Sequence, residues 1–147
     1  MPDRPRWLTQ RPRRHAAHQT PQQPAAEVIG RRTRAEVEAE QRRADWHVEH
    51  ERRTGAREPG GGRSYHEGVA DAVRWALGER ETAPVTGRYS PPGVPGAAEL
   101  RAEDDAAYDA IYRQRPNSYQ TGVQAALMWV RGETQQRAAL GIPDDRP

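Results

Sequence analysis

The sequence contains no cysteine, no phenylalanine and few aliphatic residues, and each shortage excludes a class of protein. Without cysteine, the chain has no disulfide framework, no thiol nucleophile and no thiolate metal site. Leucine, isoleucine and valine together number 17 of 147 residues, near 12%. That fraction lies below the level of about 20% at which disorder becomes a serious expectation. A further 22 residues are alanine, which buries little area, so a large hydrophobic core is excluded.

Long apolar runs are missing as well. No segment approaches the length of about 20 apolar residues that spans a bilayer. The N-terminus lacks the apolar region of a secretory signal. We therefore expect a cytoplasmic protein that does not contact a membrane.

Lysine is also absent, and all 23 basic residues are arginine. A genome rich in G and C favours arginine codons, but a need for bidentate contacts to phosphate or carboxylate would favour arginine too. Composition does not separate these explanations. The positions are more informative, because residues 1–63 carry a net charge of +5 and residues 64–147 a net charge of −3.

The positive charge is most concentrated in residues 1–24, which contain several prolines and a single acidic residue, Asp3. Such a segment buries too little surface to fold alone, so we expect a disordered, extended basic arm. Arms of this kind bind nucleic acid by neutralising phosphates. A solubilising tail and a partner-bound peptide are the alternatives. The candidate phosphate contacts are the arginines of this arm and three that follow it: Arg4, Arg6, Arg11, Arg13, Arg14, Arg31, Arg32 and Arg34.

A charged helix is predicted within residues 25–55. Thr33 and Glu36 have the spacing of a capping box, and Gly55 is a plausible end of the helix. The apolar stripe of this helix is thin, and Trp46 points away from it. The sequence leaves open whether the helix docks on the rest of the chain.

Residues 56–147 form the predicted helical repeat domain. Its first helix begins at a second capping box, Ser64 with Glu67. A linker rich in proline and glycine occupies 83–96, and further helices are expected over roughly 97–113 and from 118 to 132 or 139. The helix at 97–113 has a predicted inner stripe of Leu100, Ala107, Tyr108 and Ile111. The acidic cluster Glu103-Asp104-Asp105 is interpreted as its first turn, where carboxylates are favoured.

An internal duplication is the strongest signal in the chain. Residues 64–79 read SYHEGVADAVRWALGE and residues 118–133 read SYQTGVQAALMWVRGE, with eight of 16 positions identical at an offset of 54. Chance would give about one or two matches. Each copy follows a charged helix, so the ancestral unit resembles a helical hairpin.

The duplicated residues predict packing. A glycine in a helix costs about 1 kcal/mol relative to alanine, yet both copies place one four residues before an alanine. The small pair opens a notch for close approach of another helix, so the copies should pack on each other about a pseudo-twofold axis. An aromatic ligand surface is the alternative role for the tyrosines and tryptophans. The predicted packing residues are Tyr65, Gly68, Ala72, Trp75, Tyr119, Gly122, Ala126 and Trp129.

The repeated helix, YxxGVxxALxWxxG, resembles segments in small proteins of actinobacteria and of their phages and integrative elements. The resemblance covers only residues 64–79 and 118–133. It implies a mobile-element setting in a genome rich in G and C, and it carries no activity and no catalytic residues with it.

Two clusters could carry chemistry, and each has a simpler explanation. His47 and His50 lie three apart, with His66 as a conceivable third metal ligand, but the spacing is not that of HExxH, so a solvated helix face is expected. Residues 60–64, Gly-Gly-Gly-Arg-Ser, lead into a helix N-terminus, which can hold anions. The Lys-Ser/Thr pair of a P-loop is missing, so a flexible connector is expected.

We therefore predict an all-α fold, a small helical bundle made from two related helical hairpins with an extended basic N-terminal arm. The predicted function is non-enzymatic, with no cofactor, no metal and no catalytic residue. The chain would be an accessory or regulatory protein of an actinobacterial mobile element. Its folded part would bind a protein partner or itself, and its arm would contact nucleic acid. The alternative is a phage virion or scaffold protein whose arm orders against neighbouring subunits.

Overall fold

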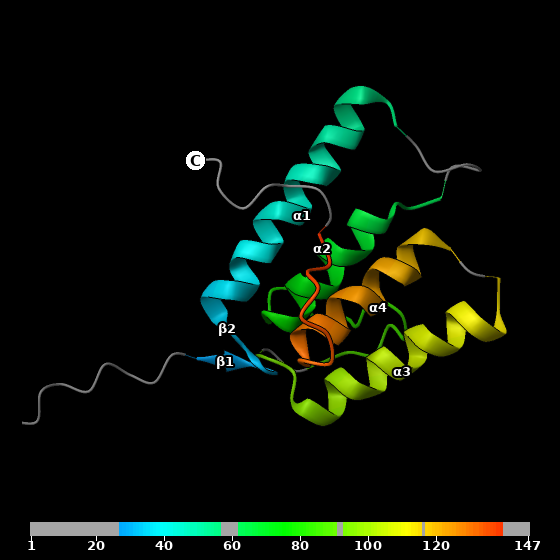
Figure 1. Cartoon of the computed structure of the whole chain (residues 1–147). Helices are drawn as coiled ribbons and strands as arrows, with labels where there is room; N and C mark the ends of the chain where they lie inside the picture. The colour runs from blue at the N-terminus through cyan, green and yellow to red at the C-terminus, as the bar shows by residue number, and fades with distance from the viewer. Residues whose placement is uncertain (1–26, 57–61, 91–92, 116, 140–147) are drawn as a thin grey trace, which may run out of the picture.

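The computed structural model describes residues 27–56, 62–90, 93–115 and 117–139. The predicted arm at 1–24 lies outside these residues. The described part is mostly helical, as predicted, with four helices: α1 (Arg34–Thr54), α2 (Tyr65–Ala76), α3 (Ala97–Arg113) and α4 (Ser118–Val130). α2 and α4 lie in the centre, α1 packs on α2, and α3 packs on α4 (Figure 1).

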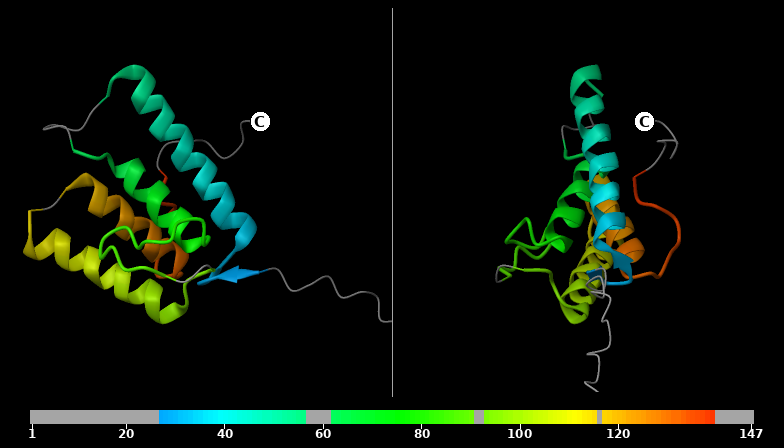
Figure 2. Two further views of the ribbon diagram at one scale, coloured as in Figure 1. Left: turned by 180° about the vertical axis from the view of Figure 1, so that it is seen from behind. Right: turned by 90° about the vertical axis from the view of Figure 1, so that its left-hand side faces the viewer.

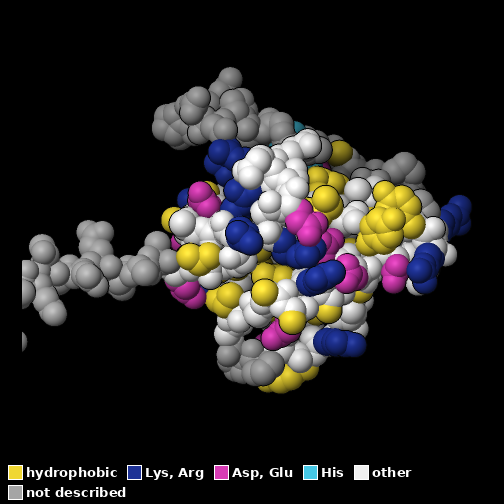
Figure 3. Space-filling model, turned by 60° about the horizontal axis from the view of Figure 1, so that its bottom comes forward, with side chains coloured by type: hydrophobic (Ala, Val, Ile, Leu, Met, Phe, Trp, Pro, Cys, Tyr) yellow, Lys and Arg dark blue, Asp and Glu magenta, His cyan; other side chains and the backbone are white. Residues whose placement is uncertain are grey.

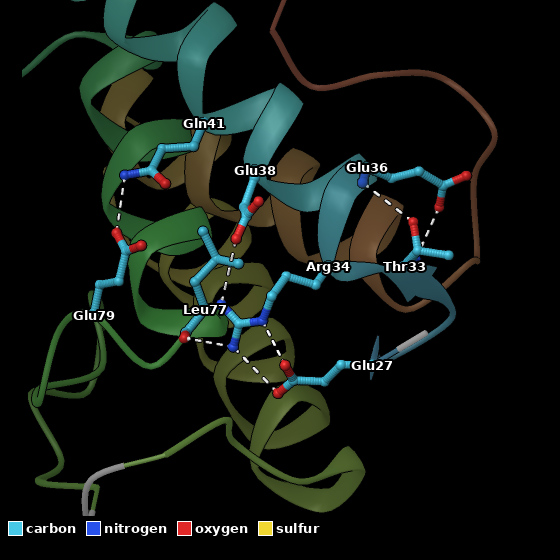
Figure 4. Close-up of polar contacts among 8 residues, drawn as sticks. All are labelled: Glu27, Thr33, Arg34, Glu36, Glu38, Gln41, Leu77 and Glu79. Carbon is cyan, nitrogen blue, oxygen red and sulfur yellow. Dashed lines mark hydrogen bonds and ion pairs between the residues drawn. The ribbon is translucent and has the colours of Figure 1, made fainter. Parts of the chain in front are cut away.

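Both predicted capping boxes are present. The Glu36 backbone N–H donates to Thr33 Oγ1, and the Thr33 N–H donates to the Glu36 carboxylate at the start of α1 (Figure 4). Ser64 and Glu67 make the same reciprocal pair at the start of α2. Gly55 ends α1 in the left-handed conformation, with φ of 69°.

The two copies of the repeat pack directly on each other, as their glycines predict. A Cβ added to Gly68 would lie 2.0 Å from the carbonyl oxygen of Tyr119, and one added to Gly122 would lie 2.0 Å from that of Tyr65. The contacts are reciprocal, which is the signature of a twofold relationship between α2 and α4. Trp75 and Trp129 are buried beside this contact, at 2% and 5% exposure.

The repeat also explains how α2 and α4 end. Gly78 and Gly132 have φ of 79° and 75°, and the N–H groups of Glu79 and Glu133 each donate 2.9 Å back to a helix carbonyl. This is the Schellman arrangement, in which a residue with positive φ closes the last turn. The Gly-Glu pair that ends each repeat is therefore a helix stop.

The structure extends the duplication to the outer helices. α1 and α3 begin 63 residues apart, and at that offset their buried positions correspond, Val37 with Leu100 and Ala44 with Ala107. Glu40 corresponds to Glu103, and both glutamates are buried, at 0% and 2% exposure. Each half of the molecule is therefore one helical hairpin, followed by an irregular segment. Val37 and Ala44 belong to the same core as α2 and α4, so α1 docks on the repeat helices.

Each buried glutamate accepts hydrogen bonds from the irregular segment of the other half. Glu40 on α1 accepts from the backbone N–H of Ala139, at 2.6 Å. Glu103 on α3 accepts from the N–H groups of Val85 and Thr86, at 2.5 and 2.9 Å. Seen edge-on, the segment after α2 lies on one side of the helix layer and the segment after α4 on the other (Figure 2).

Two local expectations about α3 were wrong, and one short element was not predicted. A two-stranded antiparallel hairpin, β1 (Val28–Ile29) and β2 (Arg32–Thr33), precedes α1. Tyr108, placed on the inner stripe of α3, is 51% exposed, because the inner face is formed instead by smaller or charged side chains.

The acidic cluster is not the first turn of α3, since the helix begins at Ala97 and only Glu99 lies in that turn. Asp104 is buried and forms an ion pair with Arg131, the residue that follows α4. Burial raises the pKa of Asp104, and the hydrogen bond from Arg131 opposes that effect.

Candidate binding cleft

A cleft of about 560 Å³ lies between α3 and the loop that follows α2. Trp75 closes its inner end, residues of the loop form one wall, and the Glu99–Asp109 stretch of α3 forms the other. In Figure 3 the surface is hollowed near its lower edge, where acidic and hydrophobic side chains meet. One of the two predicted packing tryptophans therefore also borders an open cavity.

Hydrogen bonds hold the loop in place on α3. Residues Thr82 and Tyr89 form an isolated antiparallel bridge that closes the loop. The Glu103 carboxylate accepts from two backbone N–H groups at the tip and from Thr86 Oγ1, at 2.8 Å. A carboxylate that receives three donors fixes the loop through charge-assisted hydrogen bonds. The loop wall is therefore built by the fold and does not depend on a ligand.

A second chain of contacts fixes the inner end. The Trp75 indole N–H donates to Ser90 Oγ at 3.4 Å, and that hydroxyl donates to the Glu99 carboxylate at 3.3 Å. Ser90 is 8% exposed, so these polar groups are satisfied internally. The cleft thus has a defined aromatic and polar floor.

The charge of the cleft is negative. Glu99, Asp105 and Asp109 border it together with the buried Glu103, whereas Arg88 is the only cation among the described lining residues. Tyr89, at the rim, is 66% exposed. Carboxylates with an exposed aromatic ring favour a cation, and a guanidinium binds both groups well.

The other half of the molecule shows how a guanidinium lies against the corresponding tryptophan. Arg32 places its guanidinium carbon 4.9 Å from the ring centroid of Trp129. The same side chain donates to the carbonyl oxygens of Trp129 and Thr134, each at 2.8 Å. Arg32 thereby joins β2 to the segment after α4.

The arginines predicted as phosphate contacts are placed as follows. Arg32 is engaged with Trp129 and its neighbours, as described above. Arg34 forms an ion pair with Glu27 at 2.6 Å and donates to the Leu77 carbonyl oxygen at 3.4 Å (Figure 4). Arg31 is exposed. The five arginines of the arm lie outside the described residues.

The histidines form a stack between α1 and α2. The rings of His47 and His66 are 4.0 Å apart and nearly parallel. His66 Nδ1 lies 2.8 Å from the Glu51 carboxylate. His50 turns away and stacks on Trp46. Among the described residues, no group of three or more His, Cys, Asp or Glu side chains is placed to hold a metal ion.

A basic hollow borders the start of α2, near the glycines considered for anion binding. It is lined by four arginines, but neighbouring carboxylates hold several of them: Arg80 lies 2.7 Å from Asp71, and Arg74 lies 2.6 Å from Asp45. Asp71 also accepts from the Tyr119 hydroxyl, at 2.7 Å. Burial, with the hydrogen bond to Asp71, raises the pKa of Tyr119. The cations of this hollow are thus largely compensated within the fold.

Sequence reasoning missed the cleft because its carboxylates appear to be an ordinary charged helix face. The one usable signal was the pattern Ala-Glu-Val/Leu-x-Ala-Glu, shared by residues 35–40 and 98–103, which identifies Glu103 as the counterpart of Glu40.

No described helix is long and apolar enough to cross a membrane. Comparison with protein-family models, with curated proteins and with solved structures gave no match.

Proposed function

We propose that this chain is a non-enzymatic accessory or regulatory protein of the cytoplasm, whose helical part is a protein-interaction module and whose basic arm contacts nucleic acid. The observation that carries the proposal is the separation of charge. The described residues contain 16 arginines and 17 acidic residues, whereas residues 1–26 contain five arginines and one acidic residue. The excess positive charge of the chain therefore resides in the arm.

The contacts of the folded part support this division of roles. Arg32 and Arg34 already bind carbonyl oxygens or carboxylates, and a phosphate would have to displace those partners. The arm arginines are therefore the better phosphate contacts. Such contacts are electrostatic and release counterions, so their strength falls steeply with salt.

Support for a protein-interaction role comes from the exposed features of α3 and its surroundings. The acidic cleft favours a basic segment. On another face of α3, Tyr108 and Tyr112 are 51% and 68% exposed and border a groove that also contains Met128 of α4. Tyrosine and methionine are enriched at protein interfaces.

Titration of duplex DNA into the full chain at about 50 mM and about 200 mM salt tests the nucleic-acid contact. Neutralising five phosphates predicts a loss of affinity of up to about 500-fold between these conditions. Replacing the five arm arginines with glutamine should abolish the binding.

A matched control replaces five exposed arginines of the folded part with glutamine: Arg42, Arg52, Arg53, Arg101 and Arg115. This variant has the same net charge as the arm variant and should retain most of the affinity. Equal losses in the two variants, or no binding by the full chain at low salt, would contradict the proposed role of the arm.

A further inference from the structure

We propose that the acidic cleft beside Trp75 binds guanidinium groups of the chain's own residues 1–24, and that nucleic acid competes with the cleft for these arginines. The contact between the arm and the cleft is argued from the geometry of the fold. The competition rests on the proposed function, because it requires the arm to bind nucleic acid.

The internal duplication points to a guanidinium as the ligand. Trp75 and Trp129 are equivalent residues of the two copies, and Arg32 covers the Trp129 ring at 4.9 Å. At the offset of 63 that relates α1 to α3, the residue corresponding to Arg32 is Pro95, which carries no cation. Trp75 therefore lacks the arginine that Trp129 receives from the segment preceding the opposite hairpin.

The residues around the cleft suit such a ligand. Asp105 and Asp109 lie one turn apart on α3, and both are exposed. Asp109 is paired with Arg113 at 3.5 Å, and both side chains of this pair are exposed, so a guanidinium of the arm can replace Arg113 and make bidentate contacts with the carboxylates. Glu99 extends the negative charge toward the floor. The exposed Tyr89 ring at the rim offers a flat surface on which a guanidinium stacks.

The attachment point of the arm favours this occupant over a separate molecule. Glu27 lies three residues after the end of the arm and is paired with Arg34, which in turn contacts the Leu77 carbonyl just before the cleft loop. An extended segment of this length spans up to about 85 Å, so every part of the cleft is within reach. If the arm is disordered, as its composition predicts, the tether gives an effective concentration in the millimolar range, which is enough to occupy a weak site.

The consequence is a competition for the same arginines. A guanidinium held by Asp105 and Asp109 is not available to a phosphate, so occupation of the cleft lowers the apparent affinity for nucleic acid. Removing the two carboxylates should raise that affinity about twofold to fivefold, which corresponds to a contact formed half to four-fifths of the time.

The contact is tested by NMR on the full ¹⁵N-labelled chain, following the Trp75 indole N–H and the backbone amides of 105–109. Three backgrounds are compared: the natural sequence, the cleft variant Asp105→Asn/Asp109→Asn, and the control Glu49→Gln/Glu133→Gln. The control removes two exposed carboxylates outside the cleft. In each background, the five arm arginines are then replaced with glutamine.

Arm substitution should shift the cleft signals in the natural and control backgrounds, but not in the cleft variant. Unchanged cleft signals in the natural background would overturn the proposal. The shifts should also survive tenfold dilution; if they decline, the ligand is the arm of a second copy and the intramolecular contact is wrong.

Titration of duplex DNA then tests the competition. The cleft variant should bind more tightly than the control by the stated factor, and equal affinities would overturn the competition. If the full chain binds no DNA while the arm-dependent shifts are present, the proposed function fails and the cleft contact stands. If DNA binds while those shifts are absent, the cleft contact fails and the proposed function stands.

Discussion

Gly68 of α2 lies so close to Tyr119 of α4 that a Cβ at the glycine would be 2.0 Å from the tyrosine's carbonyl oxygen. Gly122 has the same relationship to Tyr65. Neither neighbour can move aside easily, because both atoms belong to the helix backbone. The two glycines therefore set the distance between the central helices.

Gly68→Ala and Gly122→Ala should each lower the free energy of unfolding by about 3 kcal/mol, at the upper end of the usual cost of overpacking. The gain in helix propensity, about 1 kcal/mol, is too small to compensate. Urea unfolding measures the change. Gly62→Ala is the control, since nothing lies within 4 Å of its added Cβ; a similar loss there would show that the close approach is not the cause.

Glu103→Gln should destabilise the fold by about 2 kcal/mol, because the loop loses charge-assisted hydrogen bonds at its tip. Amide hydrogen exchange gives a sharper readout, since the Val85 and Thr86 amides should exchange faster while the Ala139 amide stays protected. Glu40→Gln should give the opposite pattern. Identical exchange patterns in the two variants would contradict the finding that each glutamate holds the irregular segment of the other half.

Stability should fall in alkaline solution. Burial raises the pKa of Tyr65 and of Tyr119 above the ordinary value of 10.0. The unfolded chain therefore loses these phenol protons first, so the contribution of both groups is full below about pH 10 and is lost as the pH rises through their folded values.

Urea unfolding between about pH 9 and about pH 12 measures this decline. Tyr119→Phe should make the decline shallower, because the substitution removes one of the two titrating groups. Tyr112→Phe should not, since that side chain is 68% exposed. An unchanged slope in Tyr119→Phe would assign the alkaline sensitivity to another group.

Arg32→Lys separates structural from nucleic-acid roles at one position. Lysine keeps the charge but loses the planar fork that bonds the Trp129 and Thr134 carbonyl groups. We expect the free energy of unfolding to fall by about 2 kcal/mol, with the affinity for duplex DNA changed by less than about twofold. A strong loss of DNA affinity with unchanged stability would restore Arg32 as a phosphate contact.

The parts of the fold that local chemistry specifies could be predicted. Capping boxes at Thr33 and Ser64 fixed two helix starts, because each involves residues three apart in sequence. The duplicated glycines predicted the contact between α2 and α4. A glycine destabilises a helix relative to alanine, and close packing against a neighbouring helix is a reason for its presence there.

Features that depend on residues far apart in sequence were missed. The relation between α1 and α3 escaped a comparison without gaps, because their offset of 63 differs from the offset of 54 between the repeat helices. Glu103 resembled any acidic residue of a charged helix, and its burial follows from a loop 17 to 18 residues away. The cleft is equally invisible in sequence, because its two walls become neighbours only after that loop closes.

The exchange of hydrogen bonds between Glu40, Glu103 and the segments they hold has a consequence for unfolding. Detaching one hairpin from the other would remove the three donors of the Glu103 carboxylate and the Ala139 donor of the Glu40 carboxylate. Heat should therefore melt the whole domain in a single calorimetric transition, and a fragment cut between the hairpins should remain unfolded until the missing fragment is added.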